Sequence, residues 1–206
     1  MPRTGELQFE LTGGALCLDF ANTLNGRFTS TPNDQLRDYS DIVAWSRQTG
    51  VISDARARQL VRAAPRNPAK AASLLGQAIE TREAIFATFS AVAEGRPAPA
   101  AALAVFNKAL SKNLSHSEIV RDGNTFVWGF NGGEPSLDET LWAVTRSAAE
   151  LLTSPEIYRV RECAAETCAW LFLDGSRNGS RRWCDMKVCG NRAKIRRFRK
   201  SHGTAH

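Results

Sequence analysis

Four cysteines in the last quarter of the chain have the residue type and spacing of a metal site. They follow the pattern C-x4-C-x15-C-x4-C and are Cys163, Cys168, Cys184 and Cys189. Two close pairs of thiolates provide the tetrahedral set that Zn²⁺ prefers, with Zn–S distances of about 2.3 Å. Four sulfur ligands leave no position for water or substrate, so we expect one structural zinc ion and no catalytic metal.

Two other interpretations of the cysteines are open at this point. Four thiols could belong to an ordinary core, although the equal spacing of the two pairs, beside Trp170 and Trp183, argues against it. An iron–sulfur cluster also accepts four thiolates, but its cysteines usually include a tighter spacing. The N-terminus lacks the apolar stretch of a signal peptide. We therefore expect a cytoplasmic location, where reduced thiols favour a metal over disulfides.

Positive charge is concentrated in the same part of the chain as the four cysteines. Residues 155–206 contain 12 Lys and Arg against 5 Asp and Glu, whereas residues 1–154 contain 15 against 16. The net charges are therefore +7 and −1, so the C-terminal part is expected to meet a polyanion. The residues predicted to contact nucleic acid are Arg177, Asn178, Arg181, Arg182, Arg192, Lys194, Arg196, Arg197, Arg199 and Lys200.

A helix from residue 189 to about residue 200 is expected to present this charge. Its period places three cations on one face: Arg192, Arg196 and Arg199. The apolar Ile195 and Phe198 are expected to pack back toward the cysteines. Arginine suits both phosphates and guanine edges, so we expect a nucleic acid, with duplex DNA as the predicted partner. The alternatives are RNA, an acidic protein partner, and a solvated helix face that binds nothing.

The cysteines and their surroundings resemble the CGNR zinc-finger family. The match covers about residues 160–202 and includes the tetrapeptide that names the family, Cys189-Gly190-Asn191-Arg192. The other matching runs are Leu171-Phe172-Leu173-Asp174, Ser176-Arg177-Asn178 and Ser180-Arg181-Arg182-Trp183-Cys184. Residues 13–23, Gly-Gly-Ala-Leu-Cys-Leu-Asp-Phe-Ala-Asn-Thr, are similar to the opening of the ABATE domain that precedes the finger in that family.

The resemblance implies a bacterial, stress-linked transcription regulator with DNA as its partner. Regulators of this size often pair a binding module with a sensing or dimerising module, so a small-molecule effector and a homodimer are both expected. Asp19, Asn22 and Thr23 could line the effector pocket, but they also serve well as helix-capping and turn residues. Arg82, on the apolar side of a long predicted helix, is expected to pair with a carboxylate such as Asp19.

The predicted fold class is α+β, with a domain boundary after residue 154. Residues 1–154 form a mostly helical domain with a small antiparallel β element, and residues 155–206 form a treble-clef-like zinc module. Apolar periodicity and capping residues predict helices over about 33–48, 53–64, 68–95, 98–112 and 137–152. Strands are predicted at 7–11, in a hairpin around Asp122-Gly123-Asn124, and at 157–161, 170–173 and 182–184.

Several function classes receive no support from the sequence. No run approaches eighteen apolar residues, so no membrane span is predicted. His116, His202 and His206 are isolated, and the chain has no glycine-rich phosphate loop, nucleophile elbow or pair of catalytic carboxylates. We therefore expect a binding protein and not an enzyme.

Overall fold

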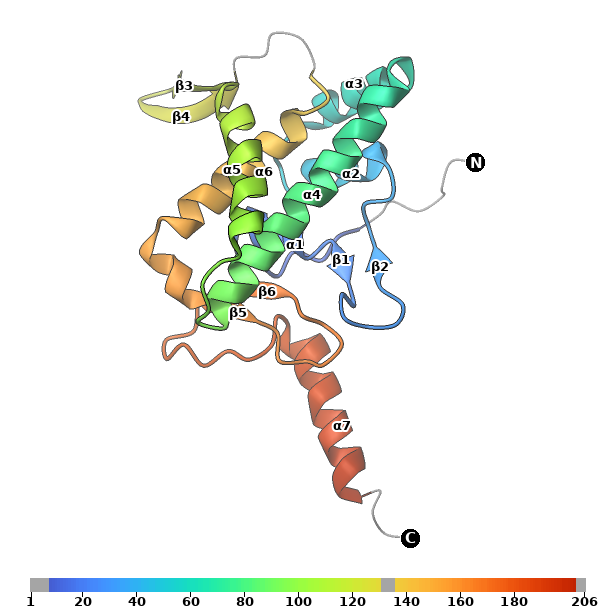
Figure 1. Cartoon of the computed structure of the whole chain (residues 1–206), viewed down its shortest axis with the longest axis vertical. Coiled ribbons are helices and arrows are strands. Elements are labelled where there is room, and N and C mark those ends of the chain that lie inside the picture. Colours follow the sequence, from blue (N-terminus) through green and yellow to red (C-terminus); the bar gives the residue numbers. More distant parts are fainter. Residues whose placement is uncertain (1–7, 131–135, 203–206) are drawn as a thin grey trace.

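A long helix organises the fold in the computed structural model, which describes residues 8–130 and 136–202. This helix, α4 (Pro68–Ala93), crosses the body of the molecule (Figure 1). It contacts α1 (Leu16–Ala21), α2 (Tyr39–Gln48), α5 (Ala100–Leu114) and α6 (Glu139–Leu152), while α3 (Asp54–Ala63) packs on α2. The last helix, α7 (Asn191–His202), extends away from this body.

Three two-stranded antiparallel sheets complete the described part of the chain. They pair β1 (Leu24–Asn25) with β2 (Asn33–Asp34), β3 (Ser117–Asp122) with β4 (Thr125–Phe130), and β5 (Val160–Glu162) with β6 (Leu171–Leu173). The short helical turns are η1 (Ala64–Arg66), η2 (Pro155–Arg159) and the π-helical η3 (Met186–Gly190). The predicted α+β class, mostly helical with small antiparallel sheets, is confirmed.

Capping residues set several helix boundaries where the sequence predicted them. The side chain of Ser53 accepts a hydrogen bond from the N–H of Arg56 at the start of α3. Asn67 does the same for α4, in front of Pro68. Gly50 and Gly95 follow α2 and α4 with φ values of 74° and 69°. Glycine adopts this left-handed conformation at little cost, which explains why both helices end there.

The predicted start of α2 is wrong. The helix was expected to begin near Asn33, but Asn33 and Asp34 pair with β1, and α2 begins at Tyr39. Asp38 is its N-cap and accepts from the N–H of Asp41 at 3.1 Å. A short strand pairing therefore takes residues that the sequence pattern assigned to the helix.

The predicted strand over residues 7–11 is also wrong within its described part, residues 8–11, which form no strand. The backbone N–H of Phe9 donates to the side-chain carbonyl of Gln48, and the Gln48 amide donates to the Phe9 carbonyl, at 2.8 and 2.7 Å. One side chain from α2 thus replaces a partner strand, while the Phe9 ring is buried in the core.

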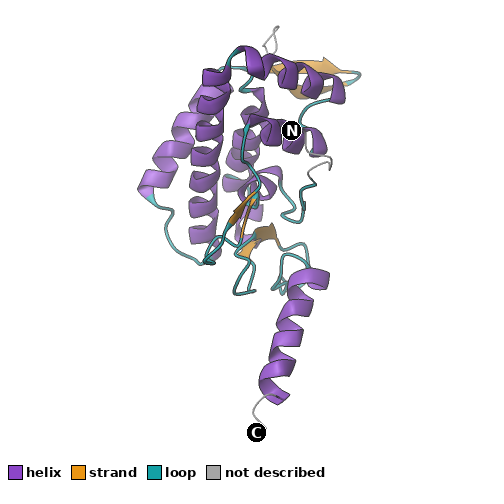
Figure 2. Ribbon diagram, turned by 90° about the vertical axis from the view of Figure 1, so that its right-hand side faces the viewer, coloured by secondary structure: helices purple, strands orange, loops and turns teal. Residues whose placement is uncertain are grey.

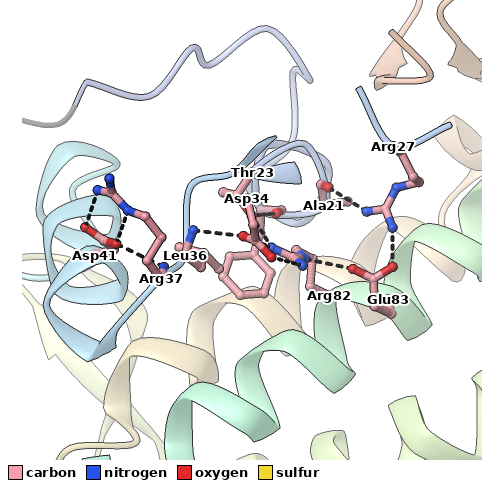
Figure 3. A network of polar contacts seen from close by, with 10 residues as sticks. Ala21, Thr23, Arg27, Asp34, Leu36, Arg37, Asp41, Arg82 and Glu83 are labelled. Atoms are coloured by element: carbon pink, nitrogen blue, oxygen red, sulfur yellow. Dashed lines mark hydrogen bonds and ion pairs between the residues drawn. The ribbon is translucent and has the colours of Figure 1, made fainter. Parts of the chain in front are cut away.

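Arg82 lies buried on α4, but its partner is not the predicted Asp19. Its guanidinium donates to both carboxylate oxygens of Asp34, at 2.7 and 2.8 Å (Figure 3). Burial alone would raise the pKa of Asp34, but the hydrogen bonds from Arg82 outweigh it and the pKa is lowered. The pair fastens β2 to α4. Glu83, the next residue of α4, binds Arg27 in the same network.

Strands β5 and β6 pack against the helical body although they follow the predicted domain boundary. Val160, Ala169 and Leu171 belong to the same buried cluster as the core residues of α1 and α4. A second, smaller cluster gathers Trp170 and Phe172 with Cys163, Cys184 and Cys189. Alternate residues of β6 therefore face the two clusters, as expected for a strand. The strand pair is the element that carries the cysteine region on the body.

Candidate metal centre and basic helix

The four predicted cysteines converge on one point. Their sulfur atoms all lie within 4.8 Å of one another, and Sγ of Cys184 is 3.6 Å from Sγ of Cys168 and from Sγ of Cys189. Four sulfurs placed about 2.3 Å from a central ion at tetrahedral angles lie about 3.8 Å apart. A disulfide would need a separation of about 2.05 Å. The geometry therefore fits one tetrahedral metal ion and no disulfide.

The electrostatics of the cluster also favour a cation. Hydrogen bonds from the thiols of Cys168 and Cys184 lower the pKa of Cys163. Hydrogen bonding to Cys163 then raises the pKa of Cys168 and of Cys184, and burial raises the pKa of Cys189. Four thiolates cannot accumulate in so small a volume without a compensating charge. A Zn²⁺ ion supplies that charge and completes a closed structural site.

Two turns deliver the cysteines in pairs. In the first, the N–H of Cys163 donates to the Trp170 carbonyl at 2.8 Å, and the N–H of Cys168 donates to the Ala165 carbonyl at 2.9 Å. The second turn is η3, where the Asp185 carboxylate accepts from the N–H of Val188 at 2.8 Å. Each turn thus folds four intervening residues into a loop that brings its two sulfurs together.

Two charged residues organise the loop that leads to Cys184. Asp174, 1% exposed, accepts hydrogen bonds from the backbone N–H groups of Ser176 and Arg181, both at 2.9 Å. The Arg181 guanidinium donates to the carbonyls of Trp183 and Cys184 and lies 4.4 Å from the Phe172 ring centre. The guanidinium of the half-buried Arg181 thus holds the segment that carries Cys184, and its contact with nucleic acid stays a prediction.

No structural role was predicted for Asp174 from the sequence. A signal was present, because an isolated acidic residue follows the apolar run 171–173 in a strongly basic region. The third strand predicted at 182–184 is absent, since Arg181 and Asp174 organise this segment as an irregular loop. The strand predicted at 157–161 is shortened to β5, because η2 occupies residues 155–159.

The residues predicted to line an effector pocket lie where the helical body meets β6. The Asn22 side chain, 2% exposed, donates to the carbonyl of Leu171 and accepts from its N–H, both at 2.9 Å. Thr23 donates to the Phe20 carbonyl at 2.8 Å. Asp19 accepts from the N–H of Gly13 at 2.8 Å, and burial raises its pKa to about 6.

Gly13 adds a third contact at the same junction. Its carbonyl accepts from the N–H of Leu173 at 2.8 Å, so β6 is bonded to the body at both of its ends. A Cβ on Gly13 would stand 2.9 Å from the backbone nitrogen of Asp19, which leaves no room for a side chain. The segment from Gly13 to Thr23 thus holds β6, and with it the cysteine region, on the helical body. An effector bound to Asp19, Asn22 and Thr23 stays a prediction.

The basic helix α7 follows η3 directly and projects from the body, as Figures 1 and 2 show. Among the predicted contacts on α7, the exposed ones are Arg192, Lys194, Arg196, Arg197 and Arg199. Lys200 belongs to the helix, but its side chain lies outside the described residues. Arg177, Asn178 and Arg182 are exposed on the loop before Cys184. Arg196 forms an ion pair with Glu166 of the first cysteine turn.

The predicted orientation of α7 is wrong in one respect. Ile195 and Phe198 were expected to pack toward the cysteines, but 53% and 60% of these residues are exposed. The half-buried Ala193 faces the first cysteine turn instead, in a hollow that it lines together with Ala164 and Ala165. The small side chain fits close to the turn, and the two larger apolar residues therefore lie on the opposite side of the helix.

Comparison with known families gives two matches that together span nearly the whole chain. Residues 14–155 match the family model of ABATE, described as "Putative stress-induced transcription regulator". Residues 159–202 match the model of the CGNR zinc finger. No curated protein matches the chain. A search of the described residues for a helix both long and apolar enough to cross a bilayer found none.

Proposed function

Because this chain belongs to the ABATE family and ends in a CGNR zinc finger, we propose that it regulates transcription by binding duplex DNA through α7. The observation that carries the proposal is the arrangement of α7. The helix begins one residue after the η3 turn that holds Cys189, projects from the body, and contains no acidic residue. The zinc ion thereby anchors one end of a cationic helix and leaves the rest accessible.

The dimensions of α7 suit a major groove. Its 12 residues span about 18 Å at about 1.5 Å per residue. A helix with its side chains is about 10–12 Å wide, close to the groove width of about 12 Å. Exposed Arg192, Lys194, Arg197 and Arg199 surround the helix and can reach phosphates on both walls. Arg177 and Arg182, on the neighbouring loop, extend the positive surface.

The proposal makes this a binding protein and not an enzyme. A tetrathiolate zinc site holds structure and has no position for a reacting group. The cations act on a polyanion by charge and by displacing counterions, which needs no titratable group tuned to neutral pH. Nothing in this mechanism selects a base sequence, because phosphate contacts alone carry no sequence information.

Fluorescence anisotropy with a labelled duplex tests the proposal. We expect the triple variant Arg192→Gln, Arg197→Gln, Arg199→Gln to bind at least tenfold more weakly than the parent protein, since three phosphate contacts are lost. The matched control replaces Arg58, Arg62 and Arg66 by Gln. These arginines are exposed on α3 and η1, and their replacement removes the same charge from the body.

Equal affinity of the parent protein and the α7 variant would refute the proposal. An equal loss in the two variants would show that binding follows net charge and not α7. Competition with single-stranded and hairpin RNA distinguishes the two nucleic acids, because sequence-specific RNA-binding proteins favour unpaired bases. Stronger binding to such RNA than to the duplex would replace DNA by RNA as the partner.

A further inference from the structure

An exposed apolar pair on α7 has no role in phosphate binding. Ile195 and Phe198 are 53% and 60% exposed, and they lie three residues apart on the face that also carries Asn191. Together with Lys194, Arg197 and Arg199, these three residues line one continuous surface hollow. Ala193 occupies the side of the helix toward the first cysteine turn. The apolar pair therefore points away from the first cysteine turn.

The charges around the pair indicate which partner covers it. Lys194 lies on one flank of the apolar stripe and Arg199 on the other, and both are exposed. A protein or lipid partner could bury the apolar side chains, but a groove of duplex DNA matches the complete pattern. Its phosphates form two negative walls, and the thymine methyl is the apolar group on the floor of the major groove.

The spacing of the pair allows this placement, because it lies between one and two base-pair steps. Residues 195 and 198 are separated by about 4.5 Å along the helix axis, at about 1.5 Å per residue. One base-pair step is about 3.4 Å. The side-chain amide of the third residue on this face, Asn191, donates to the carbonyl of Lys187 at 2.8 Å and is engaged within the finger. The apolar pair is thus the part of this face best placed to meet base edges.

We propose that Ile195 and Phe198 contact thymine methyl groups on neighbouring base pairs, so that α7 prefers duplexes rich in A·T pairs. This inference rests on the proposed function, since it requires α7 to lie in the major groove. It adds a source of sequence preference, which phosphate contacts do not supply. The preference depends on a methyl group and not on a hydrogen bond.

The test compares two short duplexes of alternating A·T pairs, one with thymine and one with deoxyuridine, which lacks the 5-methyl group. The phosphates and the minor-groove edges are the same in both. Burial of one methyl group corresponds to about a fourfold change in affinity. We therefore expect the parent protein to bind the deoxyuridine duplex about 4–15-fold more weakly, for one or two methyl contacts.

The double variant Ile195→Ala, Phe198→Ala is expected to bind both duplexes with equal affinity. Its control, Val61→Ala with Phe126→Ala, removes an aliphatic and an aromatic side chain that are 46% and 70% exposed elsewhere on the body, and should keep the discrimination. A G·C duplex with 5-methylcytosine in place of cytosine restores a methyl group in the same groove. The parent protein should bind it more tightly than the unmethylated duplex.

The outcomes separate this inference from the proposed function. If the parent protein binds none of the A·T and G·C duplexes, the proposed function fails, and the inference fails with it. If it binds the G·C duplexes but neither A·T duplex, only the inference fails. If the parent protein binds the thymine and deoxyuridine duplexes equally well, α7 still binds DNA but the methyl contact is wrong. Discrimination that persists in the double variant would also overturn the assignment to Ile195 and Phe198.

Discussion

At the scale of single residues, Asn22 shows how a short signature joins two parts of the chain. One side-chain amide satisfies both backbone groups of Leu171, 149 positions away in sequence. A buried backbone group left without a partner costs about 1–3 kcal/mol. Asn22 therefore replaces, with a single side chain, the strand that would otherwise have to pair with β6 at this position. The same residue type at a pocket wall would have looked identical in the sequence.

Asp19 gives a pH-dependent prediction at the same scale. Burial raises its folded pKa to about 6, above the ordinary 3.8, so the ionised form destabilises the fold. The stability that the neutral form provides is complete below pH 4 and is lost as the pH rises to about 6. Asp19→Asn keeps an oxygen for the Gly13 N–H and cannot ionise.

We expect the Asn variant to match the parent protein at pH 4 and to exceed it by about 1 kcal/mol at pH 7, after allowance for partial exposure. Urea unfolding of both proteins at the two pH values measures this difference. A difference that is the same at pH 4 and pH 7 would contradict the assigned cause, because a purely structural effect of the amide has no reason to follow the titration.

At the scale of elements, the finger is divided between two supports. Strands β5 and β6 are held by the helical core through Val160, Ala169 and Leu171. The turn η3 and helix α7 depend on the zinc site, because the contacts of α7 are mainly with η3. Small zinc modules obtain most of their folding free energy from the metal, about 10–16 kcal/mol. In this chain, the segment from Cys184 onward is the part whose folding depends on the metal.

Removal of zinc should therefore uncouple these elements. We expect chelation to abolish hydrogen-exchange protection in η3 and α7, while β5, β6 and the body helices keep theirs. Cys189→Ser should produce the same pattern and lower the zinc content, which is expected to be about one atom per chain. Cys17→Ala is the matched control, because Cys17 is fully buried in α1, away from the cluster.

Loss of protection throughout the chain would contradict this division and favour a single cooperative unit. Persistent protection of α7 after metal removal would show that other contacts hold the helix. The measurement also tests the domain boundary after residue 154, which stays a prediction. If protection is lost only beyond β6, the domain boundary lies closer to Cys184 than to residue 154.

Elements with a local cause were the predictable part of this fold. Helices α3, α4, α5 and α6 follow their apolar periodicity, and the β3–β4 hairpin follows its Asp-Gly turn. Capping side chains close in sequence mark the starts of α3 and α4. The start of α2 was missed because β2 pairs with β1. The Arg82–Asp34 pair was missed because its two residues, 48 positions apart, meet only in the folded chain. Distant pairings leave no periodic signal.

The candidate site was also predictable only in part. The four metal ligands were predictable, since their spacing reflects two turns that fold locally. The roles of Asp174 and Arg181 were not, because they depend on which carbonyls and N–H groups the loop leaves unpaired. The outward face of α7 was assigned wrongly, since periodicity defines the faces of a helix but not which one meets its neighbour.

At the scale of the whole molecule, the positive charge is concentrated in the C-terminal part of the chain. The helical body is close to neutral, and the finger carries a net charge of +7 at one end of the molecule. The β3–β4 hairpin lies toward the other end, away from α7 (Figures 1 and 2). A duplex can therefore approach α7 along its length without meeting the hairpin.

Duplex affinity as a function of salt concentration tests the central claim, that zinc holds α7 as a cationic surface for DNA. If about six cations of the finger meet phosphates, log K should fall with log salt at a slope of about −5, at about −0.9 per contact on duplex DNA. The zinc-loaded protein should show this slope, and the Arg192, Arg197, Arg199 triple variant should lose about 3 from its magnitude. A slope near zero, or one that the variant leaves unchanged, would contradict the account.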